Sequence, residues 1–400
     1  MERKKIIRAT TVPQSLNGFC RGMLRKLSEK YEVIGLSSPG EALDEVAERE
    51  GVRTIAVLME RHISLWKDIK SLMQMVRVFR RERPDMIHSM TPKAGLLCMI
   101  AGWLTRVPVR IHTFTGLVWP TSTGLKRKVL MLTDKLTCAC ATHIIPEGEG
   151  VKNDLINGKI TKKPLKVLGY GNVRGVDMEQ YSRRPEVMKM AEMLRDETKF
   201  TFLFVGRIVG DKGINELCVA FERLHKEFPL TRLWLVGGFE ETLDPVKPET
   251  KVRIEDGQGE IEAVGAKRGD ELLAYYAAAD CFVMPSYREG FPNTVLEAGA
   301  MGLPSIVTDI NGSREIIVKG KNGMIVPPRD EVRLYEAMKL MMFSNLDRER
   351  MAANARQMIA DRFEQGFVRK CLYEFYDEVM GKDEGRKTKN VNYNDDVNLN

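Results

Sequence analysis

The chain has 400 residues, of which 43% are hydrophobic and 29% are charged. An ordinary domain has about 100–200 residues, so we expect two domains, and the composition excludes a wholly disordered chain. The longest apolar run, residues 95–104, is about half of the roughly 20 residues that span a bilayer. Residues 1–5 lead directly into a strand-like segment and show no cleavable signal pattern. These features predict a chain that is neither secreted nor membrane-spanning.

The positive charge lies in the first half of the chain. The formal net charge is +7, and residues 1–170 carry 29 Lys and Arg against 16 Asp and Glu, whereas the remainder is mildly acidic. We therefore expect an anionic partner for the first half, either nucleic acid, an anionic membrane surface or a phosphorylated substrate. The seven cysteines form no C-x-x-C pair, which is typical of buried thiols in a reducing cytoplasm and not of disulfides or a zinc site.

Short β-rich runs alternate with longer amphipathic runs through both halves of the chain. The strands expected in the first half are Lys5–Ala9, Glu32–Leu36, Arg53–Leu58, Asp85–Ser89, Val109–Thr113 and His143–Ile145. Those expected in the second half are Phe200–Val205, Arg232–Val236, Cys281–Met284, Ser305–Val307 and Gly323–Val326. This alternation predicts an α/β fold with two Rossmann-like parallel sheets, each covered by helices on both faces.

The same pattern places the domain boundaries. A Gly- and Arg-rich stretch without periodicity, Gly169–Arg184, is interpreted as the linker between domains at 1–170 and 171–380. Three helical segments end the second domain, at Glu331–Phe343, Arg348–Arg362 and Phe367–Met380, and the last is expected to pack back on the first domain. Residues 381–400 are polar and Asn-rich and are predicted to be a disordered tail. In open α/β sheets ligands bind at the carboxyl ends of the strands, so we expect a crevice there.

The first motif of the second half follows the strand Phe200–Val205. Gly206, Gly210 and Gly213 allow close approach of the backbone to a ligand, and Arg207 and Lys212 bracket the turn. The spacing does not fit a Walker A loop. An anion site and an ordinary βα turn with surface cations stay open as alternatives.

The second motif is residues 284–298, which follow the strand Cys281–Met284. Pro292 suits the first turn of a helix, so Glu289 is expected in the loop and Glu297 about one turn into the helix. The free N–H groups at the helix start favour an anion, whereas a carboxylate suits the vicinal hydroxyls of a ribose or sugar ring. Each Glu alone is also compatible with an ordinary solvated or salt-bridged residue.

Together these motifs resemble a retaining glycosyltransferase of family 4, which has the GT-B architecture. The matching residues are Gly206-Arg207, Lys212-Gly213 and the E-x7-E pair Glu289 and Glu297. Gly175-Val176-Asp177 and residues 327–330 agree with it, and the likeness extends to about residue 380. Residues 88–95 and 116–128 are similar to those of enzymes of capsule, O-antigen and lipid-linked oligosaccharide assembly.

The resemblance implies a donor site for a nucleoside-diphosphate sugar, with UDP as the expected nucleotide. Arg207, Lys212 and Glu289 would be the catalytic residues: the two cations would hold the diphosphate and Glu289 the hydroxyls of the transferred sugar. Glu297 would hold the ribose and Gly265 would lie near the base. The remaining donor residues would be Gly206 and the helix start Gly290, Phe291, Pro292, Asn293 and Thr294. Such enzymes need no metal or other cofactor, and no D-x-D triplet occurs in the sequence.

In the first half the resemblance implies an acceptor-binding domain, in which four residues are candidates. Gly18 stands where relatives carry a glycine loop, although the common double glycine is missing, so a turn glycine is an equal alternative. Thr115 occupies the position of the histidine in the T-x-H-G pattern of many relatives and cannot act as a base near neutral pH. His88 lies at the end of the strand Asp85–Ser89 and Lys93 at the start of the helix after it, and for His88 a purely structural role stays open.

The expected helix Ser64–Arg83 carries many cations along one side, and residues 126–128 add three more. It is either an ordinary helix covering the sheet or a site of reversible attachment to anionic lipid, in which each cation near the surface contributes roughly 1 kcal/mol. No recognition-helix or RNP-like pattern supports nucleic acid.

The sequence therefore predicts a cytoplasmic, metal-independent retaining glycosyltransferase, peripheral on the inner face of the membrane. It would transfer a hexosyl or N-acetylhexosaminyl group from a nucleoside-diphosphate sugar to a lipid-linked saccharide in surface polysaccharide synthesis. Two alternatives stay open: a sugar-nucleotide epimerase of similar fold, and a non-catalytic scaffold subunit of the same fold.

Overall fold

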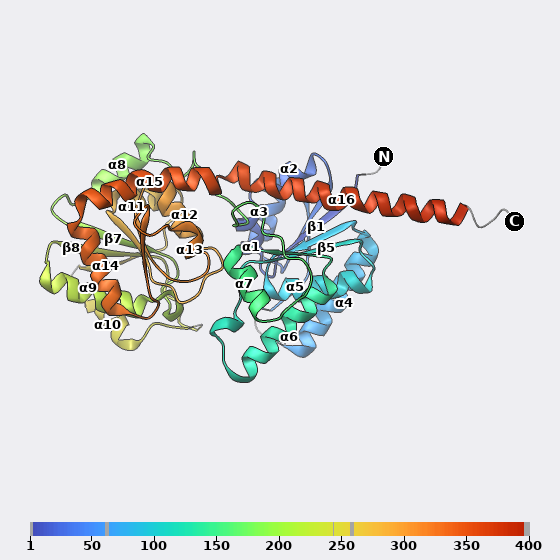
Figure 1. The fold of residues 1–400 in the computed structure, drawn as a ribbon, viewed down its shortest axis with the longest axis horizontal. Helices are drawn as coiled ribbons and strands as arrows, with labels where there is room; N and C mark the ends of the chain where they lie inside the picture. The colour runs from blue at the N-terminus through green and yellow to red at the C-terminus, as the bar shows by residue number, and fades with distance from the viewer. Residues whose placement is uncertain (1–2, 61–63, 243, 257–259, 396–400) are drawn as a thin grey trace. The chain divides into compact units, whose positions relative to one another are not determined.

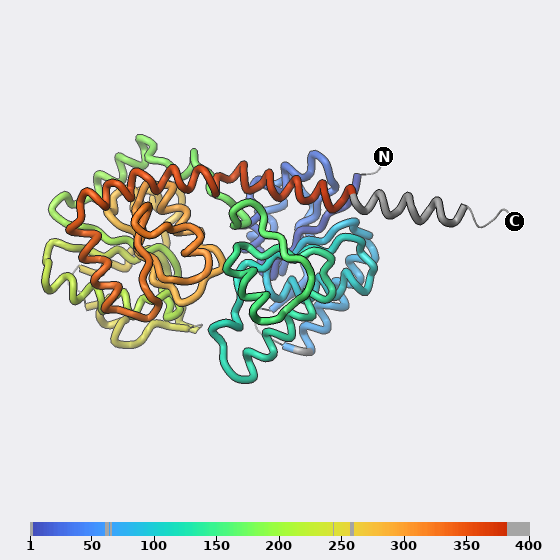
Figure 2. Tube along the Cα trace, viewed as in Figure 1, coloured from blue at the N-terminus to red at the C-terminus, as the bar shows by residue number. Residues whose placement is uncertain are grey.

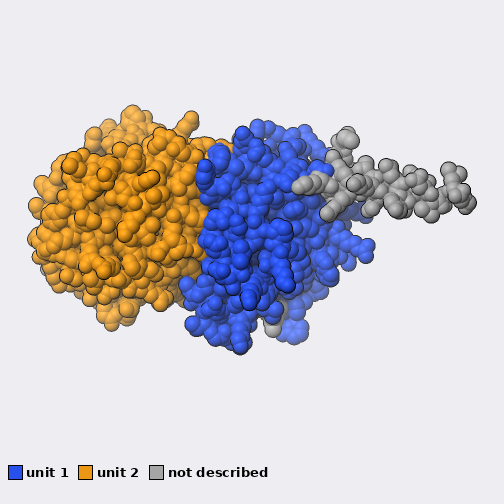
Figure 3. Space-filling view, viewed as in Figure 1, with its two compact units in different colours: residues 1–174, 367–400 blue, residues 175–366 orange. Residues whose placement is uncertain are grey.

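The computed structural model describes residues 3–60, 64–242, 244–256 and 260–395, without the side chains of Leu65 and of residues 382–395 (Figures 1 and 2). The chain divides into two compact units (Figure 3). Unit 1 comprises residues 1–174 and 367–400, and unit 2 comprises residues 175–366. The chain therefore passes from unit 1 to unit 2 within the predicted linker and returns at residue 367, four residues beyond the end of the preceding helix.

Unit 1 is built on a six-stranded parallel sheet with the order β3-β2-β1-β4-β5-β6. The strands are β1 Lys5–Ala9, β2 Glu32–Ser37, β3 Arg53–Ala56, β4 Met86–Ser89, β5 Val109–Phe114 and β6 His143–Pro146. The helices are α1 Pro13–Phe19, α2 Met23–Ser28, α3 Glu41–Glu50, α4 Leu65–Glu82, α5 Pro92–Leu104, α6 Gly124–Cys140, α7 Glu149–Asn157 and α16 Gln365–Asp395, with a 3-10 turn at Trp119–Thr121.

Successive side chains of a strand point to opposite faces of the sheet, so each strand of unit 1 contributes to two cores. Ile7 of β1 joins one core with α4, α5, α6 and α7, whereas its neighbour Ile6 joins the other with α1, α2 and α3. The second core also contains the buried apolar side of α16, which includes Phe375 and Tyr376. A helix that follows unit 2 in the sequence thus completes the core of unit 1, as the sequence predicts for its last helical segment.

Unit 2 repeats the arrangement with the sheet order β12-β11-β10-β7-β8-β9. Its strands are β7 Phe200–Val205, β8 Thr231–Val236, β9 Ile261–Gly265, β10 Cys281–Met284, β11 Ser305–Thr308 and β12 Gly323–Val326. Its helices are α8 Pro185–Leu194, α9 Ile214–Glu227, α10 Pro248–Asp256, α11 Gly269–Ala278, α12 Asn293–Ala300, α13 Ser313–Ile316, α14 Glu331–Phe343 and α15 Asn345–Phe363, with a 3-10 turn at Gly210–Lys212.

The predicted α/β fold with two Rossmann-like sheets is confirmed, and every predicted strand is present to within two residues at either end. One strand was missed: β9 forms the edge of the second sheet and pairs with β8 across a register shift at Leu235/Val236. Helix α16 extends to Asp395. The backbone of residues 381–395 is therefore helical, whereas the sequence predicted a disordered tail at 381–400. Residues 396–400 of the predicted tail lie outside the described residues.

A buried arginine connects α16 to the sheet of unit 1. The fully buried Arg8 of β1 donates from Nη1 to the hydroxyl oxygen of Tyr376 and lies against His88 Nδ1, each at 2.5 Å. Tyr373, one turn earlier on α16, also has a buried hydroxyl, but this hydroxyl has no hydrogen-bond partner among the described residues. The two tyrosines therefore differ in what their hydroxyl groups contribute to stability.

We predict that Tyr376→Phe lowers the free energy of unfolding by about 1–3 kcal/mol, because it removes a partner from a buried guanidinium. Tyr373→Phe is the matched control and should leave the free energy unchanged or raise it slightly, since its hydroxyl gains nothing in the folded state. Urea unfolding of the full chain measures both. An equal loss in the two variants would contradict the assignment.

Candidate functional site

Three loops at the carboxyl edge of the second sheet pack backbone against backbone. The first loop, 206–213, follows β7, and the second, 285–292, follows β10. Gly213 has φ +71°, and a Cβ placed there would lie 2.1 Å from the carbonyl oxygen of Pro285. In the third loop, after β11, a Cβ on Gly312 would lie 2.5 Å from the carbonyl oxygen of Gly290. Only glycine permits these approaches, so the two glycines fix how the loops meet.

Hydrogen bonds tie the first two loops together beyond this contact. The Tyr287 N–H donates to the carbonyl oxygen of Asp211 at 2.8 Å, and the Arg288 guanidinium pairs with the Asp211 carboxylate at 3.1 Å. The Tyr287 hydroxyl donates to Glu216 at 2.5 Å, and the Arg329 guanidinium lies over the Tyr287 ring at 4.5 Å. These contacts hold residues 211–212 beside residues 287–289.

The loops bring Lys212 and Glu289 into a direct ion pair. Both side chains are partly buried, and the Lys212 ammonium donates to Glu289 Oε1. Sequence analysis assigned the two residues separately, one to phosphate and one to sugar hydroxyls, and did not predict that they meet. A cation and a carboxylate side by side at a strand edge can bind a molecule that carries both an anionic group and hydroxyls.

The second loop ends at the start of α12. Pro292 is the residue before the helix, not a residue of its first turn as predicted, and its carbonyl accepts the N–H groups of Val295 and Leu296 at 3.2 and 3.4 Å. Asn293 and Thr294 therefore precede the first helical hydrogen bond, and N–H groups in this position favour an anion together with the helix dipole. Gly290 and Phe291 lie directly before them, where Gly312 packs.

Glu297 is buried on α12, with 6% of its surface exposed. Its Oε2 accepts a hydrogen bond of 3.3 Å from the hydroxyl of Tyr276 on α11. Sequence analysis did not identify Tyr276, because an apolar helix with a tyrosine gives no signal of a contact 21 residues away. This hydrogen bond fixes the orientation of the Glu297 carboxylate.

The remaining residues predicted for the donor site lie at the same edge of the sheet. Gly206 and the exposed Arg207 follow β7 directly, and Gly265 ends β9 with φ +75°. The carbonyl of Gly265 accepts the N–H of Gly237, which follows β8. The predicted contact of Gly265 with a base stays a prediction. Among the described residues no group of three or more His, Cys, Asp or Glu could hold a metal ion, and metal independence also stays a prediction.

Unit 2 also has a groove at the opposite edge of its sheet. This groove, of about 510 Å³, lies at the amino end of β7 and is lined by residues that include Arg195, Phe200, Phe228 and Arg348. None of the residues predicted for the donor site lines it. The volume alone would suggest a ligand site, but the carboxyl edge of the sheet is where open α/β folds bind ligands.

In unit 1 the structure assigns His88 to the core. The ring is buried, and since Arg8 can only donate, His88 Nδ1 accepts and Nε2–H donates to Thr113 Oγ1 at 2.7 Å. Burial and the neighbouring Arg8 charge hold the pKa of His88 well below its usual value, so the ring is neutral. Of the two alternatives left open for His88, the structural one agrees with this network.

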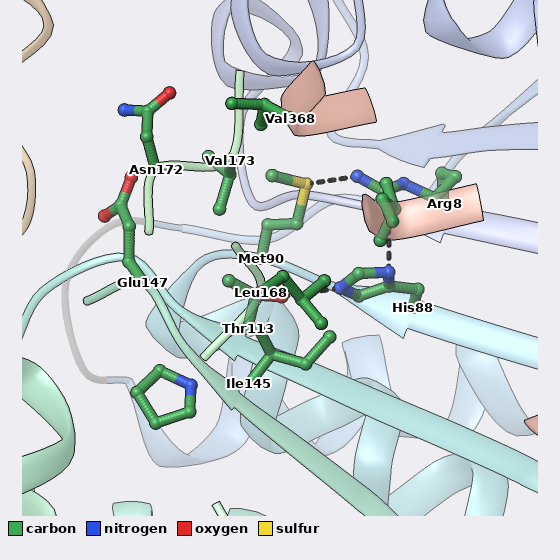
Figure 4. Close-up of a pocket in the computed structure, with 12 residues that line it drawn as sticks. Arg8, His88, Met90, Thr113, Ile145, Glu147, Leu168, Asn172, Val173 and Val368 are labelled. Atoms are coloured by element: carbon green, nitrogen blue, oxygen red, sulfur yellow. Dashed lines mark hydrogen bonds between the residues drawn. The ribbon is translucent and has the colours of Figure 1, made fainter. Parts of the chain in front are cut away.

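His88 lines a small cavity with Arg8, Met90, Thr113 and Glu147 (Figure 4). Arg8 and His88 lie on one side, joined by hydrogen bonds to Met90 and Thr113, whereas Glu147 lies across the cavity (Figure 4). The cavity volume of about 20 Å³ suits a single water molecule and not a sugar ring.

The other three acceptor candidates are placed as follows. Gly18 lies inside α1, so it is not the glycine of a turn with positive φ. Lys93 at the start of α5 pairs with Asp68 of α4 at 2.7 Å. The Thr115 hydroxyl donates to the carbonyl oxygen of Met90 at 2.9 Å, at the carboxyl edge of the first sheet.

Two family models match the chain. Residues 19–171 match the glycosyl transferase 4-like domain, and residues 188–358 match the group 1 glycosyl transferases. The capsular polysaccharide biosynthesis glycosyltransferase CapM of Staphylococcus aureus is 30% identical over 390 residues, which cover 96% of this chain and all of CapM. This chain is a group 1 glycosyltransferase.

Two further comparisons place the glycosyltransferase among known proteins. It is 27% identical over 277 residues to an Escherichia coli UDP-Gal:α-D-GlcNAc-diphosphoundecaprenol α-1,3-galactosyltransferase, with 68% of this chain and 69% of that enzyme covered. The crystal structure of Anabaena HepE with UDP and glucose superposes with a TM-score of 0.78 at 17% identity, covering 94% of this chain and all of HepE. The likeness to HepE shows the fold, and with the two parallel sheets it establishes the GT-B architecture.

We predict that Gly213→Ala destabilises this glycosyltransferase by about 1–3 kcal/mol more than Gly269→Ala does, because only the former drives a methyl group into the Pro285 carbonyl. Both glycines have a positive φ, of +71° and +55°, so both variants carry the cost of a left-handed alanine. A Cβ on Gly269 meets nothing within 4 Å. Equal losses in chemical unfolding would show that the two loops do not depend on this contact.

Proposed function

We propose that this glycosyltransferase is a retaining, metal-independent enzyme that uses a UDP-sugar to extend a lipid-linked saccharide during surface polysaccharide synthesis. The observation that carries the proposal is the Lys212–Glu289 pair held beside the start of α12. The relatives support the chemistry: CapM acts in capsule synthesis, and the Escherichia coli enzyme uses UDP-Gal and a diphosphoundecaprenol acceptor. The transferred group would be a hexosyl or N-acetylhexosaminyl residue.

The donor would bind with its charge on the first loop and on α12. Lys212 and Arg207 would hold the diphosphate, and the first N–H groups of α12 would share its negative charge. Glu297, oriented by Tyr276, would accept hydrogen bonds from the ribose hydroxyls. Glu289 would accept hydrogen bonds from hydroxyls of the transferred sugar, while it keeps Lys212 in place before the donor arrives.

The transfer would proceed by displacement on the same face as the leaving group. The acceptor oxygen would form a bond to C1 of the sugar while the bond from C1 to the phosphate oxygen breaks. The acceptor proton would pass to the departing phosphate oxygen, so no protein base is needed. The structure is compatible with this step, because Thr115 donates to a backbone carbonyl and His88 is buried and neutral. Charge that develops on the departing diphosphate would be stabilised by Lys212 and Arg207.

We further propose that the enzyme works in the cytoplasm, where the basic unit 1 contacts an anionic membrane that carries the acceptor. The excess of Lys and Arg in residues 1–170 supports this contact. No helix of the described chain is both long and apolar enough to cross a bilayer.

The test is calorimetric titration of UDP, with GDP for comparison, into the metal-free protein. Lys212→Ala should weaken UDP binding on the order of tenfold to a hundredfold, because it removes a charge-assisted contact worth about 1.5–3 kcal/mol. Lys226→Ala, which removes an exposed lysine on α9, is the matched control and should leave the affinity unchanged. If UDP fails to bind, or if Lys212→Ala is silent, the phosphate assignment is wrong and the scaffold alternative takes its place.

Glu289→Gln separates the two roles of the ion pair. The neutral amide no longer competes for the Lys212 ammonium, so UDP should bind as well as before or more tightly. Transfer from the UDP-sugar should fall by at least about tenfold, because the hydroxyl contacts of Glu289 are lost. If Glu289→Gln weakens UDP binding as much as Lys212→Ala does, then Glu289 only positions Lys212.

An unchanged anomeric configuration in the product, read by NMR, would support retention, and an inverted one would contradict it.

A further inference from the structure

Helices α4, α5 and α6 form one covering layer on the first sheet, with α5 packed between the other two (Figure 1). Each follows a strand of a parallel sheet and runs back towards the start of the next strand. The first residues of α4 and α6 therefore lie at the carboxyl edge of the sheet, where Thr115 and Met90 also lie. The outer surface of this layer, formed by the exposed residues of α4 and α6, is called the outer helical face here.

Helix α6 exposes a continuous apolar stripe on this face. Leu125, Val129, Leu132 and Leu136 follow one another at intervals of four, three and four residues, which places them on one side of a helix. All four are exposed, Leu125 by 77% and Leu132 by 66%. The opposite side of α6 already packs on the core through Leu130, Met131 and Cys138. The stripe is thus a second apolar side that the fold of unit 1 does not use.

Helix α4 shows the same arrangement at its start. Trp66 is 84% exposed, and Ile69 and Met73 are half exposed one and two turns further on. Its core side is supplied by Met75 and Phe79. Large exposed apolar side chains on one helical layer mark a binding surface more often than a solvated one, and tryptophan suits the boundary between water and lipid.

Charges on the outer helical face have one sign. Lys126, Lys128 and Lys135 flank the stripe of α6, and Lys70 and Arg77 lie on the exposed side of α4. The acids of these helices are turned inward or paired. Asp68 and Glu82 of α4 pair with Lys93 and Arg53, and burial raises the pKa of Asp134, the acid of α6, to about 7.

We propose that the outer helical face is where unit 1 docks on an anionic lipid bilayer, with Trp66 and the α6 stripe inserted at the interface and the flanking cations on the headgroup phosphates. An apolar stripe bordered by cations without exposed acids is complementary to such a surface. A second copy of the chain fits less well, since pairing this face with itself would bring lysines opposite lysines. The proposal rests on the proposed membrane contact but not on the donor assignment.

Docking of this kind would place the carboxyl edge of the first sheet next to the bilayer. Trp66 and Leu125 begin their helices at that edge, so these two inserted residues and Thr115 share one end of unit 1. A saccharide attached to a lipid diphosphate at the membrane surface would then reach this edge without leaving the bilayer. The helices α1, α2 and α3 cover the other face of the sheet and would remain in water.

Sedimentation with vesicles of phosphatidylglycerol and phosphatidylcholine in equal parts tests the proposal on the full chain. The double variant W66S/L132S should bind at least about tenfold more weakly than the wild type, because two interfacial side chains are lost. L230S/L346S is the matched control: both leucines are exposed, by 62% and 82%, but lie in unit 2, and the variant should bind as the wild type does. Vesicles of phosphatidylcholine alone should bind much less, and binding should fall with added salt.

Several results would overturn the proposal. The first is that the wild type does not bind the anionic vesicles, and the second is that L230S/L346S loses as much vesicle binding as W66S/L132S does. The third is that W66S/L132S merely converts a dimer into a monomer, as measured by sedimentation equilibrium. Calorimetry with UDP on the same variants keeps the proposals apart. If the protein binds UDP normally but does not bind the vesicles, the membrane contact and its docking surface are wrong and the donor site stands. Loss of UDP binding in the wild type contradicts the donor site and leaves the vesicle result standing.

Discussion

Close packing of backbone on backbone at the carboxyl edge of the second sheet is the constraint on which the proposed donor site depends. Gly213 against the Pro285 carbonyl and Gly312 against the Gly290 carbonyl leave no room for a side chain. The three loops meet because of these two glycines, and Lys212 and Glu289 lie side by side as a consequence. The groups that the proposed donor would need are therefore ordered before it binds, which reduces the entropy lost on binding.

Unit 1 depends on a contact between residues that lie far apart in the sequence. Tyr376, which follows the whole of unit 2 in the sequence, contacts Arg8 and His88 under the carboxyl edge of the first sheet. This network occupies the histidine and Thr113, so neither is available to take a proton from an acceptor. In a front-face transfer the departing phosphate takes that proton. Such a transfer is compatible with a unit 1 in which the buried polar groups bind α16.

The sequence was sufficient to predict eleven of the twelve strands that the structure describes and insufficient to predict the contacts between loops. Buried parallel strands such as Phe200–Val205 are nearly continuous apolar runs, and so they could be located directly. Strand β9, with Glu262 inside a run of five residues, has no such signal, and its position comes from pairing with β8 at the sheet edge. The fold class followed from the alternation of elements, which local patterns define.

The site residues could be predicted from the sequence, but the contacts between them could not. Glycines, cations and the Glu289 and Glu297 pair could be identified because they follow strands at motif spacing. The Lys212–Glu289 ion pair joins residues 77 positions apart, and the Tyr276–Glu297 hydrogen bond depends on where the fold places α11 and α12. The role of His88 was left open because the ring is buried by Tyr376, which lies 288 residues later in the sequence. Tertiary packing sets these contacts, and no local pattern encodes them.

The central claim is that a nucleoside diphosphate binds at the carboxyl edge of the second sheet. Hydrogen–deuterium exchange of the full chain, with and without saturating UDP, locates the bound nucleotide directly. The account predicts slower exchange at the amides of residues 206–213 and 290–296, with little change elsewhere in unit 2. Protection confined to the groove at Arg195–Phe200 and Phe228–Leu230, or no protection at the two loops, would contradict it.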